Sequence, residues 1–332
     1  MSKNLFVIGT RPEFIKISPI ANSLNAKILF TNQHFSQNMS KAFYSLVKNC
    51  EIIKIKKSNN LIQHDIKEYI KKINPDNVTV QGDTNTTLLG AVAAKSLNNV
   101  KLFYLESGIR NYDLREIEET NRILISYLSN INFVNHENNK NNLIQEKVPG
   151  KIFVTGSTVY ASLLEQGLIN DNIKSEDFIL VTLHRPINVD YVPRLKSILN
   201  AIDSIGVKVI FPIHPRTEKI LNVNKFKNIE LIKPLSYKKF INILKKSKLV
   251  ISDSGGLQEE CVIFRKPLII PMKHPVRPEL VNKFNIMAHE PKKILIEANR
   301  FYKGNSIFSE ISSIDNNIYG KEDSIEKILK YY

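Results

Sequence analysis

The sequence predicts an α/β protein made of two doubly wound, mostly parallel units. Three features point to this class: the length of the chain, short apolar runs that end at polar or glycine-containing turns, and helix-like segments between them. At 332 residues the chain exceeds what one hydrophobic core usually holds, which favours two domains of about 150 residues. Continuous apolar runs are typical of parallel strands buried on both faces. Their alternation with helices predicts parallel sheets covered on both sides.

The first strand–helix unit opens the chain. The apolar run LFVI at residues 5–8 ends at GTRPE, residues 9–13, and apolar residues then recur at helical spacing. Pro12 suits the first turn of a helix. Because ligands of doubly wound sheets bind beyond the carboxyl ends of the strands, Arg11 and Lys16 lie near an expected binding site. Arg11 could make a forked contact with a phosphate, although an ordinary surface arginine is the simpler interpretation.

The same alternation recurs along the rest of the chain. Strands are predicted at residues 28–30, 77–81, 101–105, 131–134, 178–183, 207–213, 229–232, 249–251 and 268–270. Helices are predicted at residues 61–73 and 86–97, and an amphipathic segment ends the chain at 324–332. A composition shift between Gly150 and Val159 suggests that the chain crosses between the domains there, near residue 157, with the following helix in the hinge.

Acidic residues stand just past two of the predicted strands. Asp83 follows the strand at 77–81, Glu106 follows the strand at 101–105, and Glu118 opens a later helix. Helix capping explains Asp83 well, and the helix dipole explains Glu118, whereas Glu106 is harder to explain in this way because it follows a buried strand and precedes a glycine loop. Their expected position at the same sheet edge as Arg11 favours chemistry, because crowded carboxylates share protons and can act as acid and base near neutral pH.

A second candidate site follows the strand at 249–251. Ser254-Gly255-Gly256 leads into a helix-like segment that carries Glu260. Unpaired backbone N–H groups at a helix start attract anions, and glycines remove the Cβ atoms that would keep a phosphate away. Taken alone, this stretch fits a phosphate-binding turn and an ordinary Ser-capped turn equally well.

In their order along the chain, these motifs closely resemble those of the non-hydrolysing UDP-N-acetylglucosamine 2-epimerases. The motifs that carry the resemblance are GTRPE with Lys16, Gln33-His34, Gly82-Asp83-Thr84, ESGIR at 106–110, EETNR at 118–122, His184-Arg185 and DSGGLQEE at 253–260. The resemblance covers residue 4 to about residue 280. It implies two Rossmann-like domains that face each other across a cleft, as in GT-B glycosyltransferases. With the last helix returning to the first domain, the expected domains are residues 1–157 with 318–332, and residues 158–317.

The resemblance also implies a reaction. In this family UDP-GlcNAc and UDP-ManNAc interconvert without a metal, a nicotinamide or another cofactor. A base removes the proton at sugar C2 while UDP leaves C1, and the bound glycal takes UDP back after a proton has returned to the opposite face. Carried over to this chain, the expected catalytic residues are Asp83, Glu106, Glu118 and His184. The expected substrate-binding residues are Arg11, Lys16, Leu235, Phe240, Ser254, Gly255, Gly256, Glu260 and Arg277. Leu235 and Phe240 fall at the uracil-contacting positions, although Phe240 could equally belong to the apolar face of its helix.

The sequence departs from the family pattern on the side of the second domain. Ile187 stands where the family has an acid, Val276 precedes Arg277, and Met272-Lys273 replaces an Arg-Asp pair. These changes leave the identity of the amino sugar more open than the reaction class. The alternatives are epimerisation of another UDP-2-acetamido sugar, hydrolysis to UDP and free ManNAc, or glycosyl transfer. His214, after the strand at 207–213, has structural and functional interpretations of equal weight.

Composition and charge argue against other classes. The net charge is +15, but the lysines are dispersed and form no basic stripe with interleaved aromatics, so we expect no nucleic-acid partner. No apolar run approaches the roughly 18 residues that span a bilayer, and no signal peptide is visible. The two cysteines, Cys50 and Cys261, lie far apart, which fits a reducing compartment. We therefore expect a cytoplasmic enzyme without a membrane partner, and the resemblance implies a homodimer.

Overall fold

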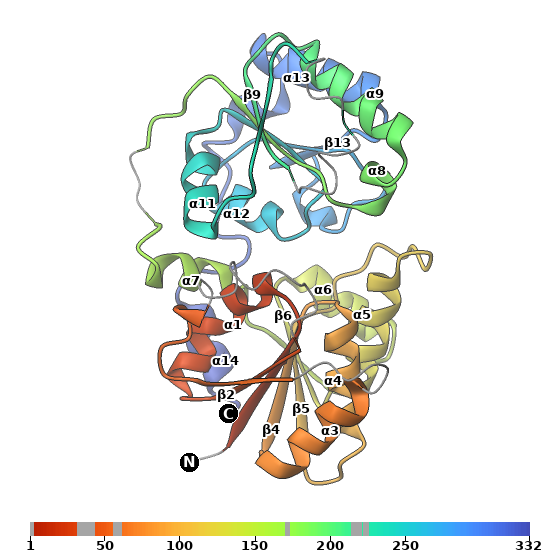
Figure 1. Cartoon of the computed structure of the whole chain (residues 1–332), viewed down its shortest axis with the longest axis vertical. Coiled ribbons are helices and arrows are strands. Elements are labelled where there is room, and N and C mark those ends of the chain that lie inside the picture. The colour runs from red at the N-terminus through yellow and green to blue at the C-terminus, as the bar shows by residue number, and fades with distance from the viewer. Residues whose placement is uncertain (1–2, 32–43, 56–61, 170–172, 214–220, 222–225) are drawn as a thin grey trace. The chain divides into compact units, whose positions relative to one another are not determined.

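The computed structural model describes residues 3–31, 44–55, 62–169, 173–213, 221 and 226–332. The chain divides into two compact units, Met1–Gly167 with Asn317–Tyr332, and Leu168–Asn316 (Figure 1). Each unit is one parallel sheet with helices on both faces, which confirms the predicted fold class. The division falls after Gly167 rather than after residue 157, because helix α7 (Val159–Glu165) packs against α1 (Arg11–Ser23) within the first unit.

The sheet of the first unit has the strand order β3-β2-β1-β4-β5-β6-β7, and all its neighbours are parallel. The strands are β1 (Asn4–Ile8), β2 (Lys27–Phe30), β3 (Glu51–Lys54), β4 (Asn77–Gln81), β5 (Lys101–Ser107), β6 (Ile131–Val134) and β7 (Lys151–Val154). The order reverses between β1 and β4, which is where doubly wound sheets bind ligands. The sequence missed β3 and β7, because these edge strands are only partly buried and start with a charged residue.

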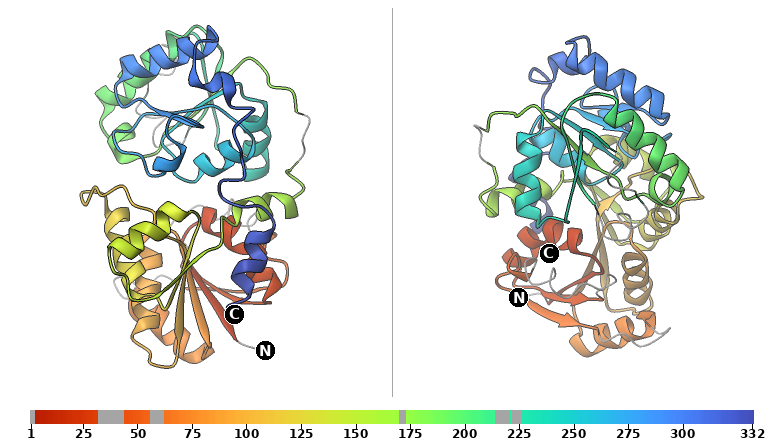
Figure 2. Two further views of the ribbon diagram at one scale, coloured as in Figure 1. Left: turned by 180° about the vertical axis from the view of Figure 1, so that it is seen from behind. Right: turned by 45° about the horizontal axis from the view of Figure 1, so that its top comes forward.

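Helices cover both faces of this sheet. One face carries α3 (Ile62–Ile73), α4 (Asn85–Lys95) and α5 (Ile117–Leu128), and the other carries α1 and α14 (Asp323–Leu329) (Figure 1). Helix α4 packs closely on β1 at Gly90, where the lack of a side chain permits the approach: a Cβ atom there would be only 2.9 Å from a methyl carbon of Val7. After α14, the hydroxyl of Tyr332 lies 2.6 Å from that of Thr79 on β4. The last segment therefore belongs to the first unit (Figure 2).

The second unit repeats the pattern with six parallel strands in the order β10-β9-β8-β11-β12-β13. The strands are β8 (Ile179–Thr182), β9 (Val209–Pro212), β10 (Ile229–Ile232), β11 (Leu249–Ser252), β12 (Leu268–Ile270) and β13 (Asn285–Met287), the last of which the sequence missed. The main core joins the sheet to α9 (Val192–Asp203) and α13 (Pro291–Tyr302). Helices α11 (Tyr237–Lys246) and α12 (Leu257–Ile263) lie on the other face (Figure 1). The order reverses between β8 and β11.

Candidate active site

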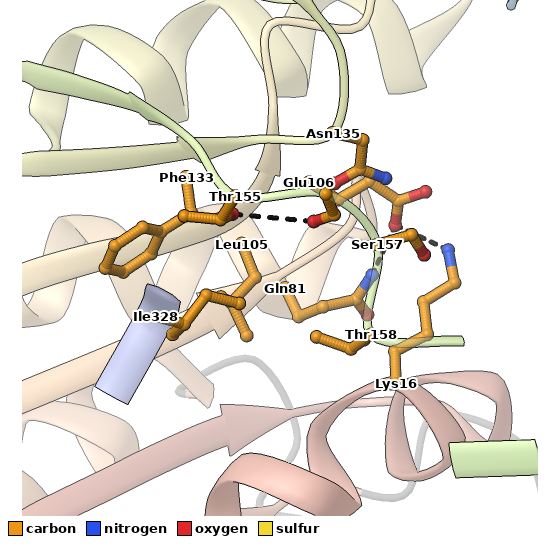
Figure 3. Close-up of a pocket in the computed structure, with 11 residues that line it drawn as sticks. Lys16, Gln81, Leu105, Glu106, Phe133, Asn135, Thr155, Ser157, Thr158 and Ile328 are labelled. Carbon is orange, nitrogen blue, oxygen red and sulfur yellow. Dashed lines mark hydrogen bonds and ion pairs between the residues drawn. The ribbon is translucent and has the colours of Figure 1, made fainter. Parts of the chain in front are cut away.

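Glu106 occupies a strained position at the carboxyl end of β5. The pairing of β5 with β6 shifts between Leu105 and Ser107, so Glu106 forms a bulge, and its φ of +66° lies in the left-handed region. Bulges redirect side chains, and such strain in a residue other than glycine is concentrated at functional sites. The redirected carboxylate lies 2.5 Å from Nζ of Lys16 and accepts a hydrogen bond from the amide of Gln81 (Figure 3). The structure thus brings together two of the expected site residues, Lys16 and Glu106.

Glu106 and Lys16 also line a small cavity within the first unit. Its volume is about 10 Å³, close to the space that one water molecule needs. Gln81 forms another part of the wall, as does the turn at residues 155–158 that follows β7 (Figure 3). A polar cavity of this size beside a carboxylate can hold a single water molecule.

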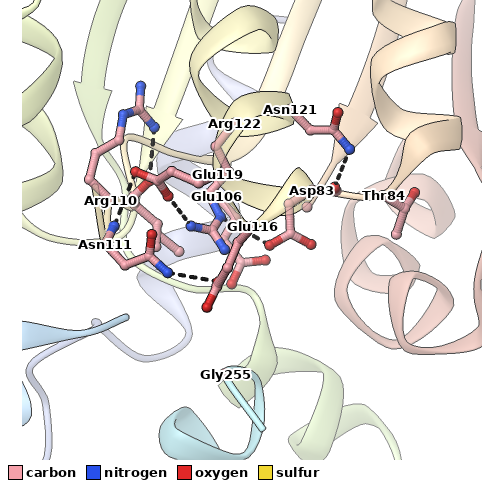
Figure 4. Close-up of polar contacts among 12 residues, drawn as sticks. Asp83, Thr84, Glu106, Arg110, Asn111, Glu116, Glu119, Asn121, Arg122 and Gly255 are labelled. Atoms are coloured by element: carbon pink, nitrogen blue, oxygen red, sulfur yellow. Dashed lines mark hydrogen bonds and ion pairs between the residues drawn. The ribbon is translucent and has the colours of Figure 1, made fainter. Parts of the chain in front are cut away.

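Asp83 lies just past the end of the neighbouring strand, β4. Its carboxylate accepts a hydrogen bond from Nε of Arg122 at 3.0 Å (Figure 4). The cap of α4 is Thr84, whose hydroxyl accepts from the backbone N–H of Thr87 at 3.2 Å. The capping interpretation of Asp83 is therefore wrong, since the neighbouring threonine takes that role and leaves the carboxylate to Arg122. The side chain of Asp83 is 38% exposed, so a ligand can reach it.

Arg122 joins Asp83 to a second acid, Glu119, that the sequence analysis missed. The side chain of Arg122 is 2% exposed, and it pairs with the fully buried carboxylate of Glu119. Burial alone would lower the pKa of Arg122, but the charges of Asp83 and Glu119 outweigh it and raise the pKa. Glu119 also accepts the backbone N–H groups of Asn111 and Tyr112, at 3.1 and 2.9 Å. It thereby shapes the loop between β5 and α5 (Figure 4).

The expected third carboxylate, Glu118, is placed differently from Asp83 and Glu106. It lies half-buried in the first turn of α5, one residue before Glu119, and makes no ion pair within the described part of the chain. A role for Glu118 in proton transfer remains a prediction.

The sequence does contain a signal for the buried pair of Glu119 and Arg122. These residues stand three positions apart, the spacing at which helical side chains meet.

Glu13, in the GTRPE motif, is a buried acid that the sequence analysis also passed over. Its carboxylate accepts the backbone N–H groups of Gly9 and Thr10, at 2.5 and 2.9 Å, and the hydroxyl of Thr84 at 3.0 Å. Burial raises the pKa of Glu13 to about 7, against the lowering effect of these hydrogen bonds, and the nearby charge of Asp83 adds to the increase. Glu13 thus ties the first turn of α1 to the residue that follows Asp83.

Stability should consequently depend on pH through Glu13. Since its pKa rises from 4.5 when unfolded to about 7 when folded, the folded state binds the extra proton between these values. The resulting stabilisation is complete below pH 4.5 and is lost as pH rises through 7, on the order of 3 kcal/mol in total. We expect Glu13→Gln to flatten the decline in unfolding free energy between pH 5 and 7.5, roughly the window of the shift, as measured by urea unfolding. Glu51→Gln, an exposed acid on β3, is the control, and an equal slope in both variants would contradict the assignment.

In the second unit, the strand ends of β8 and β11 bring His184 and Asp253 together. Nδ1 of His184 lies 3.0 Å from Oδ1 of Asp253, which is 1% exposed. The same carboxylate accepts the backbone N–H groups of His184 and Arg185, at 3.0 and 3.1 Å, and the side-chain amide of Asn188 at 2.9 Å. Burial alone would raise the pKa of Asp253. The side-chain hydrogen bond and charge of His184, together with hydrogen bonds from the side chain of Asn188 and the backbone of Arg185, outweigh burial and lower the pKa. The imidazole of His184 remains 60% exposed.

The Ser254-Gly255-Gly256 turn follows Asp253 directly. The hydroxyl of Ser254 accepts the backbone N–H of Leu257 at 3.3 Å, while Gly256 is the residue that precedes α12. Phosphate binding at this turn stays a prediction. A Cβ atom at Gly256 would meet nothing within 4 Å, and one at Gly255 would meet nothing closer than 3.9 Å, so space is open above the turn within this unit. Arg277 is buried, pairs with Glu259 and donates from Nε to the carbonyl of Gly255 at 3.3 Å. Arg277 therefore holds the backbone of this turn in place through the carbonyl of Gly255.

Three more of the expected residues, Leu235, Phe240 and Glu260, lie around α11. Glu260 accepts a hydrogen bond from the hydroxyl of Tyr237 at 2.9 Å, and burial, followed by the charge of Glu260, raises the pKa of Tyr237 well above its usual value. Leu235 and Phe240 are half-buried at the start of this helix. The side chain of Arg11, together with Gln33, His34 and His214, lies outside what the structure describes.

Two doubly wound parallel sheets, each with charged side chains at its switch point, define a two-domain α/β protein of the GT-B class. A family model described as UDP-N-acetylglucosamine 2-epimerase matches residues 20–332. The UDP-N-acetylglucosamine 2-epimerase of Methanococcus maripaludis is 36% identical, over 92% of this chain and 93% of that relative. The chain therefore belongs to the UDP-N-acetylglucosamine 2-epimerase family.

Two further relatives extend the comparison. The crystal structure of the UDP-GlcNAc 2-epimerase of Methanocaldococcus jannaschii, in complex with UDP-GlcNAc and UDP, superposes with a TM-score of 0.83. It is 32% identical, and the match covers 99% of both chains. The UDP-2,3-diacetamido-2,3-dideoxy-D-glucuronate 2-epimerase of Pseudomonas aeruginosa is 33% identical, over 99% of this chain and 99% of that relative.

Among the helices in the described ranges, none combines the length and apolar character needed to cross a membrane.

Proposed function

We propose that this protein is a non-hydrolysing epimerase that interconverts UDP-GlcNAc and UDP-ManNAc. The observation that carries the proposal is the pair of carboxylates, Asp83 and Glu106, at the carboxyl ends of the neighbouring strands β4 and β5, each held by a cation. Inversion at C2 requires a proton to leave one face of the sugar and to return to the other. Two acid/base groups suit this task, and family membership supports it.

The proposed chemistry starts at the C2–H bond. One carboxylate takes the proton, the electron pair of that bond forms the C1=C2 double bond, and UDP leaves with the electron pair of the C1–O bond. In the return step an acid on the opposite face protonates C2, and the UDP oxygen re-forms the bond to C1. Lys16 and Arg122 keep Glu106 and Asp83 in fixed orientations, which reduces the reorganisation that proton transfer demands. Glu118 and His184 complete the proposed catalytic set.

The second unit supplies most of the proposed UDP contacts. The open Ser254-Gly255-Gly256 turn, supported by Arg277, suits the diphosphate, because backbone N–H groups stabilise its charge as it leaves. Glu260, oriented by Tyr237, suits the ribose hydroxyls. Leu235 and Phe240 are proposed to contact the uracil, with Arg11 and Lys16 near the diphosphate and sugar. The resemblance further supports a cytoplasmic homodimer that supplies ManNAc-type sugars for surface polysaccharides or glycans.

The reaction can be tested by incubating the protein with UDP-GlcNAc in deuterated water and following the sugar by NMR. We expect deuterium at C2 in both UDP-GlcNAc and UDP-ManNAc, because each passage through the glycal exchanges that proton with solvent. Accumulation of free ManNAc and UDP would instead assign the protein to the hydrolysing enzymes. Formation of UDP-ManNAc without deuterium would contradict the elimination mechanism.

A second candidate substrate is another UDP-2-acetamido sugar. Ile187, which replaces the family's acid, is 54% exposed beside the buried Asn188, and Val276 is buried beside Arg277. The chain's likeness to the Pseudomonas aeruginosa relative points the same way. The same exchange experiment with UDP-2,3-diacetamido-2,3-dideoxyglucuronate separates the candidates. Faster C2 exchange in that substrate than in UDP-GlcNAc would favour the alternative.

A further inference from the structure

A series of side-chain contacts leads inward from His184 beyond Asp253. The side-chain amide nitrogen of Asn188 donates to Oδ2 of Asp253 at 2.9 Å, and its oxygen accepts from Nε of Arg194 at 2.9 Å. Arg194 lies on α9 and also donates from Nη2 to the carbonyl of His289 at 2.9 Å. The four side chains His184, Asp253, Asn188 and Arg194 therefore form one continuous network, referred to below as the His184 network.

Partners on both sides orient Asn188. Its amide nitrogen donates to Asp253 and to the carbonyl of Pro271 at 3.2 Å, and its oxygen faces the donor-only guanidinium of Arg194. A guanidinium group has no acceptor, so the atom of Asn188 that faces Nε must be its oxygen. Because Asn188 is fully buried, its amide nitrogen then has to face Asp253. The reversed amide would place its N–H groups against Arg194 and its oxygen against a carboxylate, which are two repulsive contacts in a buried site.

The orientation of Asn188 in turn affects His184. Asp253 has four donors around it, and Asn188 donates from its side chain to the second oxygen, Oδ2, at 2.9 Å. Oδ2 also accepts the backbone N–H groups of Arg185 at 3.1 Å and of His184 at 3.3 Å, so Asn188 completes the set of donors to this oxygen. With Oδ2 held, Oδ1 faces Nδ1 of His184 and favours the tautomer that carries the proton on Nδ1. The Nε2 atom of the exposed ring is then an acceptor.

We propose that Arg194 is a positioning residue for His184, acting through Asn188 and Asp253. The proposal rests on the proposed function, in which His184 contacts the substrate. Arg194 is itself held by two backbone carbonyls. Its Nη2 donates to the carbonyl of Pro271, after β12, at 3.4 Å and to the carbonyl of His289, after β13, at 2.9 Å. A lysine could not replace it fully, because one ammonium group cannot present the same fork to Asn188 and to both carbonyls.

The test uses the full chain with ¹⁵N-labelled histidine, and the His184 signals are assigned through His184→Asn. In the wild type we expect His184 to hold its proton on Nδ1. In Arg194→Met we expect the proton to move largely to Nε2, the tautomer preferred by free imidazole, with kcat for C2 exchange about tenfold lower and KM within about twofold. Arg194→Lys should lie between them. It also provides a folded variant if Arg194→Met does not fold, as judged by circular dichroism.

Lys196→Met is the matched control. Lys196 is an exposed cation on the same helix, α9, and stands outside the His184 network, so this variant should keep the wild-type tautomer and kcat. An unchanged His184 tautomer in both folded Arg194 variants would overturn the proposal. An equal loss of kcat in Lys196→Met would also overturn it, since the effect would then be structural. The tautomer is measured without substrate, so a wild type that turns over no UDP-amino sugar would refute the proposed function alone.

Discussion

Asp83→Asn is expected to abolish deuterium exchange at sugar C2, lowering its rate by about 10²- to 10⁴-fold. Asparagine retains an oxygen that can accept the Nε–H of Arg122, so the fold and the orientation of the side chain should persist. What disappears is the group that can take up or release a proton. UDP affinity should change little, because the proposed UDP contacts come largely from the second unit. Exchange is measured by NMR in deuterated water, and UDP affinity by calorimetry.

The matched control for this variant is Asp76→Asn. Asp76 stands just before β4, at the opposite end of the strand from Asp83, and its exposed carboxylate accepts the backbone N–H of Lys3 at 2.7 Å. The substitution is chemically the same, so it should leave both exchange and UDP affinity near wild type. A parallel loss of UDP affinity in Asp83→Asn would show that Asp83 binds substrate rather than transferring protons.

The second large effect is expected from Arg122→Met, which should lower the free energy of unfolding by about 3–5 kcal/mol. The substitution leaves the fully buried carboxylate of Glu119 without its cation. Asp83 is partly exposed, so loss of its ion pair should contribute little. Urea unfolding gives the value, and the loop at residues 108–116 should become more accessible to proteolysis, because Glu119 also holds its backbone.

A double-mutant cycle tests the cause of this loss. Adding Glu119→Gln to Arg122→Met removes the buried negative charge, so the double variant should be destabilised by less than the sum of the single variants. Arg115→Met, in the same loop, is the control, since Arg115 is 82% exposed and pairs with Asp113 at the surface. It should change stability by no more than about 0.5 kcal/mol. Additive single effects would mean that the buried pair is not the source of the loss.

Much of the fold could be predicted from local sequence. The predicted strands at 77–81, 131–134, 229–232 and 268–270 coincide with β4, β6, β10 and β12. Each contains at least two β-branched or aromatic apolar residues within three to five positions, a signal that can be found in local sequence. Strands β3, β7 and β13 were missed because their sequences are short or mixed and their positions depend on pairing with a neighbouring strand. The boundary between the units depended likewise on packing, that of α7 on α1.

Local sequence was enough to predict the two-sheet α/β class, the family resemblance, and the strand ends at which Asp83, Glu106, His184 and the Ser254-Gly255-Gly256 turn lie. Which side chains meet at those strand ends became visible in the folded chain alone. The contacts in question join residues far apart in the sequence: Lys16 and Glu106 are 90 positions apart, Asn188 and Asp253 are 65 apart, and Arg194 and His289 are 95 apart. The difference lies in sequence separation. The apolar pattern that predicts a strand or helix involves neighbouring residues, whereas a buried hydrogen bond at the site joins residues that become neighbours only when the chain folds.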